Sequence, residues 1–163
     1  MEDIIGLAFI TGWLAASIRL ATPLLFTSLG QVFTQRSGVL DMGVEAMMMI
    51  GALTGFVGAY YSGNPWIGIL TGMIGGVLVA LIAAYFYVTL GANQVITGVI
   101  QVVMTGALVI LLNRIIFGGS YIPPRGTGFE VVPIPYLSEL PVIGPILFRH
   151  NVLTYVSWLL VPV

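Results

Sequence analysis

Long apolar runs dominate the chain and restrict what it can fold into. Of its 163 residues, 58% are hydrophobic and 7% are charged, whereas soluble domains carry roughly 25% charged residues. The mean hydropathy is +1.08, and a chain this poor in polar groups cannot cover its own surface in water. We therefore predict an all-α, polytopic transmembrane helix bundle that is surrounded by a lipid bilayer.

The apolar runs predict a single transmembrane domain over residues 1–163. Its expected parts are spans over 4–33, 44–61, 66–90 and 94–113, a long proline- and glycine-rich loop over 114–151, and a last helix over 152–163. A spanning helix needs about 20 residues, so the last helix is unfinished. The first run contains Arg19 and Pro23 and exceeds the roughly 30 Å thickness of a bilayer core. Because proline removes a helical hydrogen bond, one kinked first span is favoured over two complete spans.

A charged stretch, Arg36 to Gly51, lies between two of these runs. Ionised side chains in lipid cost from a few to more than ten kcal/mol, roughly, so they face a bundle interior, a partner or water. Asp41 and Glu45 are four residues apart and would repel each other on one continuous helix. Either Asp41 lies in a bend, or one carboxyl is protonated, or Arg36 or a cation compensates. Alternatively, Asp41 caps a helix whose dipole favours both carboxylates. We predict a bent element here.

Small residues recur every fourth position in two of the predicted spans. The glycines expected to pack helices together are Gly51, Gly55, Gly68, Gly72 and Gly76. Residues four apart share one helix face, and small residues there let a second backbone approach closely. This pattern indicates a tightly packed bundle and says nothing about chemistry.

Polar residues follow one face of the fourth predicted span. Gln94, Thr97, Gln101 and Thr105 are three or four residues apart, and Asn93 precedes them. They form either hydrogen bonds between helices or the wall of a polar pathway. The candidate substrate-pathway residues are Asp41, Glu45, Asn93, Gln94, Thr97, Gln101 and Thr105.

Several classes of function are excluded by what the sequence lacks. There is no cysteine, and there is a single histidine, so we expect no metal site and no cofactor. The motifs GxxxxGK[ST], HExxH and GxSxG do not occur, and we expect no catalytic residues and no enzymatic activity. The net charge of −1 offers no basic surface for nucleic acid.

The charged stretch also carries a family resemblance. The run Gln35 to Ala52, QRSGVLDMGVEAMMMIGA, resembles the motif of ABC importer permeases of the branched-chain amino acid, ribose and nucleoside group. Members of that group have E-R-x-G-V-x-N-[IL]-G-x-E-G-M-M-L-x-G-A there. The segments ATPLLF at 21–26 and LGANQVITG at 90–98 match as well, and the nucleoside and simple-sugar permeases are most similar. Asp41 and Ala46 depart from the motif, which has Asn and Gly at those positions.

The resemblance implies a permease subunit of an ATP-driven importer in the cytoplasmic membrane, moving nucleosides or simple sugars. It implies ABC ATPase subunits, a second permease subunit and an extracytoplasmic solute-binding protein as partners. Family permeases are about twice as long, so the match implies an N-terminal half. The alternatives are a permease for branched-chain amino acids, an ion-coupled secondary transporter, and a structural membrane subunit.

Overall fold

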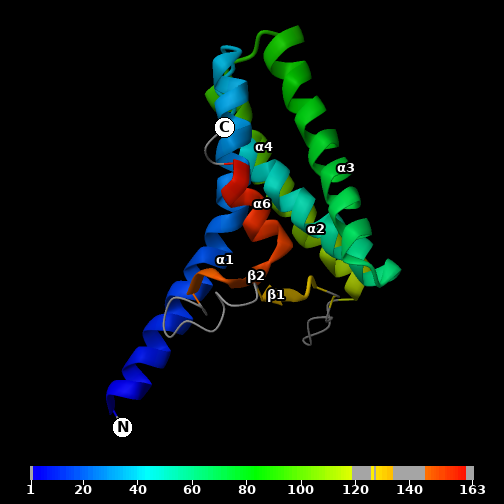
Figure 1. Ribbon diagram of the computed structural model, residues 1–163. Helices are drawn as coiled ribbons and strands as arrows, with labels where there is room; N and C mark the ends of the chain where they lie inside the picture. Colours follow the sequence, from blue (N-terminus) through cyan, green and yellow to red (C-terminus); the bar gives the residue numbers. More distant parts are fainter. Residues whose placement is uncertain (1, 119–125, 127, 134–145, 161–163) are drawn as a thin grey trace. The chain divides into compact units, whose positions relative to one another are not determined.

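The computed structural model describes residues 2–118, 126, 128–133 and 146–160 (Figure 1). Its helices and strands are α1 (Glu2–Arg36), α2 (Val44–Ser62), α3 (Pro65–Ala84), the π-helical turn η1 (Tyr85–Thr89), α4 (Gln94–Phe117), β1 (Val131–Pro133), β2 (Arg149–Asn151) and α6 (Val152–Leu160). Among the described residues, four helical stretches are long and apolar enough to cross a membrane: Phe9–Arg36, Val44–Ser62, Pro65–Thr89 and Gln94–Phe117. The predicted all-α class is confirmed.

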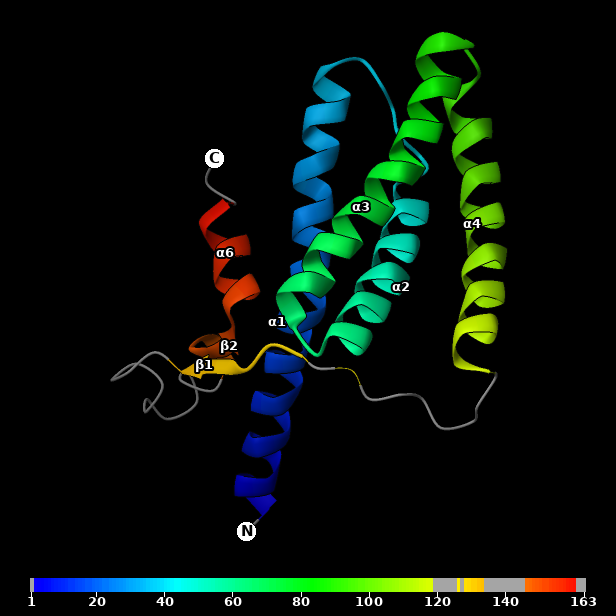
Figure 2. The ribbon, with the colours of Figure 1, turned by 90° about the vertical axis from the view of Figure 1, so that its right-hand side faces the viewer.

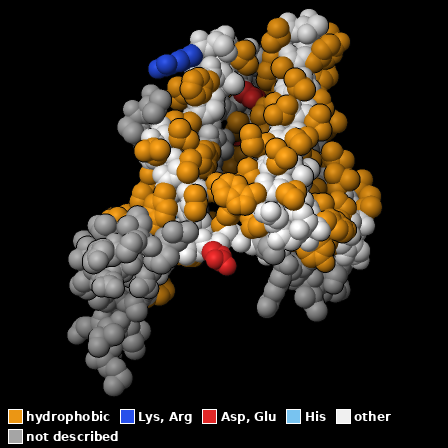
Figure 3. Space-filling model, turned by 45° about the vertical axis from the view of Figure 1, so that its right-hand side comes forward, with side chains coloured by type: hydrophobic (Ala, Val, Ile, Leu, Met, Phe, Trp, Pro, Cys, Tyr) orange, Lys and Arg blue, Asp and Glu red, His pale blue; other side chains and the backbone are white. Residues whose placement is uncertain are grey.

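The chain divides into two compact units. One comprises residues 1–30 and 129–163, and the other comprises residues 31–128. Large hydrophobic side chains are exposed along the helices, and hydrophobic side chains are spread over the described part of the face seen in Figure 3. Contact of such an apolar surface with lipid tails is favourable, whereas its exposure to water is unfavourable.

Helix α1 runs through Pro23 without a break, as one segment and not as two spans. Pro23 has no N–H, so it cannot bond the carbonyl of Arg19 one turn earlier. The hydroxyl of Thr27 donates to the carbonyl of Pro23 at 2.8 Å. This is the bond that threonine commonly makes to the carbonyl one turn earlier in a helix. The last residues of α1, from Gln31 on, belong to the second unit.

In the unit of residues 31–128, α2 and α3 form a helical hairpin. Gly63, at a φ of +66°, ends α2, and the side chain of Asn64 accepts a hydrogen bond from the N–H of Trp66 to begin α3. Pro65 occupies the first turn of α3, where its missing N–H is not needed. The predicted turn between the second and third spans therefore consists of a glycine that ends one helix and an asparagine that caps the next.

The glycines of α2 and α3 face each other across this hairpin. A Cβ built on Gly72 would lie 2.9 Å from the carbonyl oxygen of Gly51, and one on Gly55 would lie 3.1 Å from that of Gly68. A Cβ built on Gly76 would lie 3.8 Å from the carbonyl oxygen of Met47. The hydroxyl of Thr71 on α3 donates to the carbonyl of Thr54 on α2 at 3.1 Å. The two backbones approach as closely as small residues permit.

Helix α3 leads through η1 and a short turn into α4, which runs back in the opposite direction and diverges from α3 (Figure 2). Gly91 adopts a φ of +59° in this turn, and Asn93 caps α4 by accepting from the N–H groups of Val95 and Ile96. Helix α4 ends at Phe117, beyond the predicted end at 113. The ring of Phe117 packs edge-on against Phe56 of α2 at 5.6 Å.

The unit of residues 1–30 and 129–163 contains a feature that the sequence analysis did not predict. Strands β1 and β2 lie in the expected 114–151 loop and pair antiparallel, with Val132 opposite His150. Helix α6 follows β2 directly, and its Thr154 accepts a hydrogen bond from Thr22 of α1 at 3.2 Å. The residues 134–145 of the predicted loop and 161–163 of the predicted last helix lie outside the described residues.

The glycine contact between α2 and α3 is testable with a single methyl group. Gly72→Ala places a Cβ against the carbonyl of Gly51, so the helices must separate. We expect the free energy of unfolding to fall by about 1–3 kcal/mol. Thermal unfolding of the purified protein in detergent measures it. The matched control is Gly12→Ala in α1, where nothing lies within 4 Å and stability should not fall. Equal losses in both variants would contradict the packing role.

Candidate functional site

The loop from Ser37 to Gly43 leaves the end of α1 and enters α2, and its centre is Asp41. One carboxylate oxygen of Asp41 accepts from the N–H of Gly43 at 2.8 Å and from the hydroxyl of Tyr87 at 3.3 Å. The backbone carbonyl of Asp41 accepts from the side-chain amide of Gln31 at 2.6 Å. The residue is 7% exposed. Asp41 is thus held by groups from α1, η1 and its own loop.

The two carboxylates of the charged stretch have different surroundings. Helix α2 begins at Val44, with Gly43 as its N-cap, so Asp41 lies in the bend before the helix. Its bond to the N–H two residues later is the local turn that aspartate commonly makes. Glu45 lies in the first turn of α2 and is exposed. Because Asp41 precedes the helix, the two carboxylates do not share one helix face, and Glu45 lies where the helix dipole favours a negative charge.

Helix α4 holds the other side of this loop. The side-chain oxygen of Gln94 accepts from the N–H of Leu40 at 2.7 Å. A Cβ built on Gly98 would lie 2.8 Å from the carbonyl carbon of Met42 and 2.9 Å from the nitrogen of Gly43. Only a residue without a side chain lets the loop backbone lie on α4 at this point. The loop and α4 are therefore joined by one hydrogen bond and one backbone contact.

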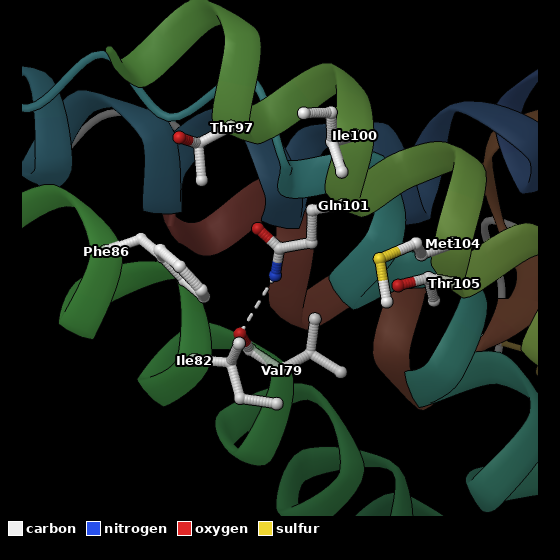
Figure 4. Close-up of a pocket in the computed structure, with 8 residues that line it drawn as sticks. All are labelled: Val79, Ile82, Phe86, Thr97, Ile100, Gln101, Met104 and Thr105. Atoms are coloured by element: carbon white, nitrogen blue, oxygen red, sulfur yellow. Dashed lines mark hydrogen bonds between the residues drawn. The ribbon is translucent and has the colours of Figure 1, made fainter. Parts of the chain in front are cut away.

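Gln101 connects this loop to a cleft between α3, η1 and α4. Its side-chain nitrogen donates to the carbonyl of Val79 at 2.9 Å (Figure 4). Its side-chain oxygen lies 2.7 Å from the position that a Cβ of Gly43 would take, and it is buried without a hydrogen-bond partner. The cleft has a volume of about 270 Å³. It is lined by Val79, Ile82, Phe86, Thr97, Ile100, Gln101, Met104 and Thr105.

Most of the predicted pathway residues fall into two groups. Asp41, Gln94 and Gln101 meet at the loop, and Thr97 and Thr105 join Gln101 at the cleft. Two predicted residues join neither group. Asn93 is exposed and caps α4, and Glu45 is exposed at the start of α2.

Tyr87 and Gln31 are site residues that sequence reasoning missed. Both are polar side chains inside apolar runs, and this position is a signal that they have a polar partner. The sequence does not identify the partner of Tyr87, because Asp41 is 46 residues away. Tyr87 belongs to the π-helical turn, where the extra residue per turn changes which side chains face inward. An α-helical pattern cannot predict that orientation.

The chemistry available at these groups is hydrogen bonding. None of the described side chains that line the cleft is charged. Over the described ranges, no group of three or more His, Asp or Glu side chains could hold a metal ion. The cleft can therefore bind a neutral polar molecule through hydroxyl and amide groups and contact its apolar faces.

The role of Asp41 as a hydrogen-bond acceptor is testable by substitution. Asp41→Asn keeps an oxygen for Gly43 and Tyr87, so we expect the free energy of unfolding to change by less than about 0.5 kcal/mol. Asp41→Ala leaves a buried N–H and a buried hydroxyl without an acceptor and should cost about 1–3 kcal/mol. Thermal unfolding in detergent compares them. If the asparagine variant loses as much stability as the alanine variant, the negative charge is what matters.

The contact of Gly98 with the loop generates a second prediction. Gly98→Ala forces the Met42–Gly43 backbone away from α4, and we expect a loss of about 1–3 kcal/mol in the free energy of unfolding. Gly106→Ala, on the same helix, meets only the flexible side chain of Met49 at 3.9 Å and serves as the control. Denaturant titration of both variants is the measurement. Similar stabilities would show that the loop does not depend on this contact.

Comparison with known proteins places the chain in a family. The family model described as "Branched-chain amino acid transport system / permease component" matches residues 13–161. Among curated proteins, a putative glucose ABC transporter permease of Haloferax volcanii is 37% identical over 96% of this chain and 47% of its own length. No solved structure matches.

Two further relatives come from bacteria. A guanosine ABC transporter permease of Bacillus subtilis is 32% identical over 88% of this chain and 49% of its own length. A nucleoside ABC transporter permease of Lactococcus lactis is 35% identical over 80% of this chain and 43% of its own length. The chain spans about half the length of the curated relatives it matches. The family resemblance seen in the charged stretch is confirmed: the chain belongs to the family of permease components of branched-chain amino acid transport systems and is a multi-pass protein of the cytoplasmic membrane.

Proposed function

We propose that this chain is part of the transmembrane permease subunit of an ATP-driven ABC importer that moves nucleosides or simple sugars across the cytoplasmic membrane. The observation that carries the proposal is the likeness to three permeases named for glucose, guanosine and nucleosides. They are 32–37% identical to this chain over 80–96% of its length.

The sequence itself supports a division of labour between subunits. The 163-residue sequence contains no GxxxxGK[ST] phosphate-binding loop, and membership of the permease family implies separate ABC ATPase subunits that hydrolyse ATP. A second permease subunit would complete the pathway, and an extracytoplasmic binding protein would deliver the solute. The four apolar helices provide the bilayer-embedded part of such an assembly.

Branched-chain amino acids are the second candidate, because the description of the family model names them. The ion-coupled alternative has less support, since the carboxylate of Asp41 is bonded to Gly43 and Tyr87 and Glu45 is exposed. A purely structural subunit would use the polar groups of α4 only for bonds between helices, as Gln101 does with Val79. The hydroxyls of Thr97 and Thr105, which have no partner among the described residues, support the transport function instead.

Uptake by cells that carry the full-length protein and its neighbouring transport genes tests the proposal. We expect accumulation of labelled uridine, guanosine or glucose to stop when ATP is depleted. It should continue when a protonophore removes the proton gradient while ATP is maintained. Pull-down of the full-length protein should recover an ATPase.

The opposite dependence, with uptake lost to the protonophore and insensitive to ATP, would contradict an ABC importer. Uptake of leucine in place of the neutral solutes would favour the second candidate.

A further inference from the structure

The cleft between α3, η1 and α4 combines an apolar wall with a row of uncharged polar groups. Ile82 and Phe86 lie on one side, and Thr97, Gln101 and Thr105 follow α4 on the other (Figure 4). The polar residues are four apart, so they share one face of α4. The volume of about 270 Å³ is near the lower end of small-molecule pockets, which begin at roughly 300 Å³. The space suits one small solute.

The two threonine hydroxyls of the cleft differ from other hydroxyls in the helices. Threonine in a helix commonly donates to a carbonyl one turn earlier. Thr27, Thr54 and Thr71 do this, with distances of 2.8, 2.8 and 3.0 Å. Within the described part of the chain, the hydroxyls of Thr97 and Thr105 make no hydrogen bond to any residue. Thr105 is also 7% exposed. These hydroxyls have donor and acceptor capacity that the fold leaves unused.

We propose that this cleft is a binding subsite for a neutral, hydroxyl-bearing ring solute, a nucleoside or a hexose. Thr97 and Thr105 bond the hydroxyl or amide groups of the solute, and Phe86 and Ile82 contact its ring. This inference rests on the proposed function, because it assigns part of the solute pathway to these residues.

The absence of charge in the cleft lining determines the solute class. An amino acid carries an ammonium and a carboxylate group, and both would enter a low-dielectric site without a counter-charge from the described lining residues. Desolvating unpaired charges is far more unfavourable than desolvating hydroxyl groups that find hydrogen-bond partners. The cleft therefore favours sugars and nucleosides over the branched-chain amino acids named by the family description.

A single introduced cysteine can report on occupancy, because the chain contains no cysteine of its own. Met104 lines the cleft and is 68% exposed, whereas the adjacent Val103 is 69% exposed and is not part of the lining. A thiol reacts as the thiolate, which needs water. In the full-length transporter in membranes, we expect a water-soluble maleimide to modify Met104→Cys and to leave Val103→Cys unmodified. Ser62→Cys, at the exposed last residue of α2, is the reactive control.

Solute protection then identifies the ligand class. Uridine or glucose should slow the modification of Met104→Cys severalfold, and leucine at the same concentration should not. None of the three solutes should affect the modification of Ser62→Cys. An unreactive Met104→Cys would mean that a lipid chain or another helix fills the cleft, and it would overturn the proposal. Equal protection by leucine would overturn the preference for neutral solutes.

The hydroxyl groups are tested by Thr97→Val and Thr105→Val, each made together with Met104→Cys. Valine keeps the shape of threonine and removes one hydrogen bond, so the half-protecting solute concentration should rise about fivefold for each. Thr54→Val is the matched control, because its hydroxyl bonds only its own helix. Basal ATP hydrolysis by each variant complex shows that it is assembled.

Unchanged half-protecting concentrations in both valine variants would refute the subsite. The unsubstituted transporter separates this outcome from failure of the proposed function. If it takes up uridine or glucose and the cleft variants bind them normally, the subsite lies elsewhere. If it takes up neither, the proposed function itself is wrong.

Discussion

The loop from Ser37 to Gly43 is non-helical backbone between two apolar helices, and its hydrogen bonds constrain much of the unit of residues 31–128. Outside a helix, N–H and C=O groups cannot satisfy one another, and in an apolar environment each unsatisfied group is costly. The N–H of Gly43 donates to the carboxylate of Asp41, and the N–H of Leu40 donates to the side-chain oxygen of Gln94. The carbonyl of Asp41 accepts a hydrogen bond from the side-chain amide of Gln31. Through these hydrogen bonds the loop connects the end of α1 to α4. The hydroxyl of Tyr87, which donates to Asp41, connects the loop to η1.

Close backbone packing allows this loop to lie among the apolar helices. The glycines of α2 and α3 bring those two helices together, and Gly98 lets the loop lie directly on α4. The π-helical turn then carries two neighbouring side chains in different directions. Tyr87 reaches Asp41, while Phe86 lines the cleft. The loop and the cleft are thus built from the same short segment, and Gln101 contacts both.

Some polar side chains of this unit are hydrogen-bonded within the fold, and others have hydroxyl groups that could bind a solute. Asp41, Gln94 and Asn93 already have partners in the fold, so their polarity is used to hold loops and helix ends. Thr97 and Thr105 have none among the described residues, and they face a cleft without charged lining. This division is the physical basis for assigning solute contact to the middle of α4. The glucose and nucleoside permeases among the relatives are named for neutral solutes of the kind that such groups recognise.

The fold class followed from the sequence alone, because burial in a bilayer depends on the length and composition of each run. Runs of about 20 apolar residues had to become helices, and glycines four apart had to share a face. The same local rules indicated that Gln94, Thr97, Gln101 and Thr105 lie near one face of α4. They could not indicate that Gln94 meets Leu40, 54 residues away, or that Asp41 meets Tyr87. They also missed the pairing of β1 with β2. Those contacts depend on how the helices cross and on the change of helical pitch at η1. Only the tertiary structure decides them, because sequence periodicity describes one helix or strand at a time.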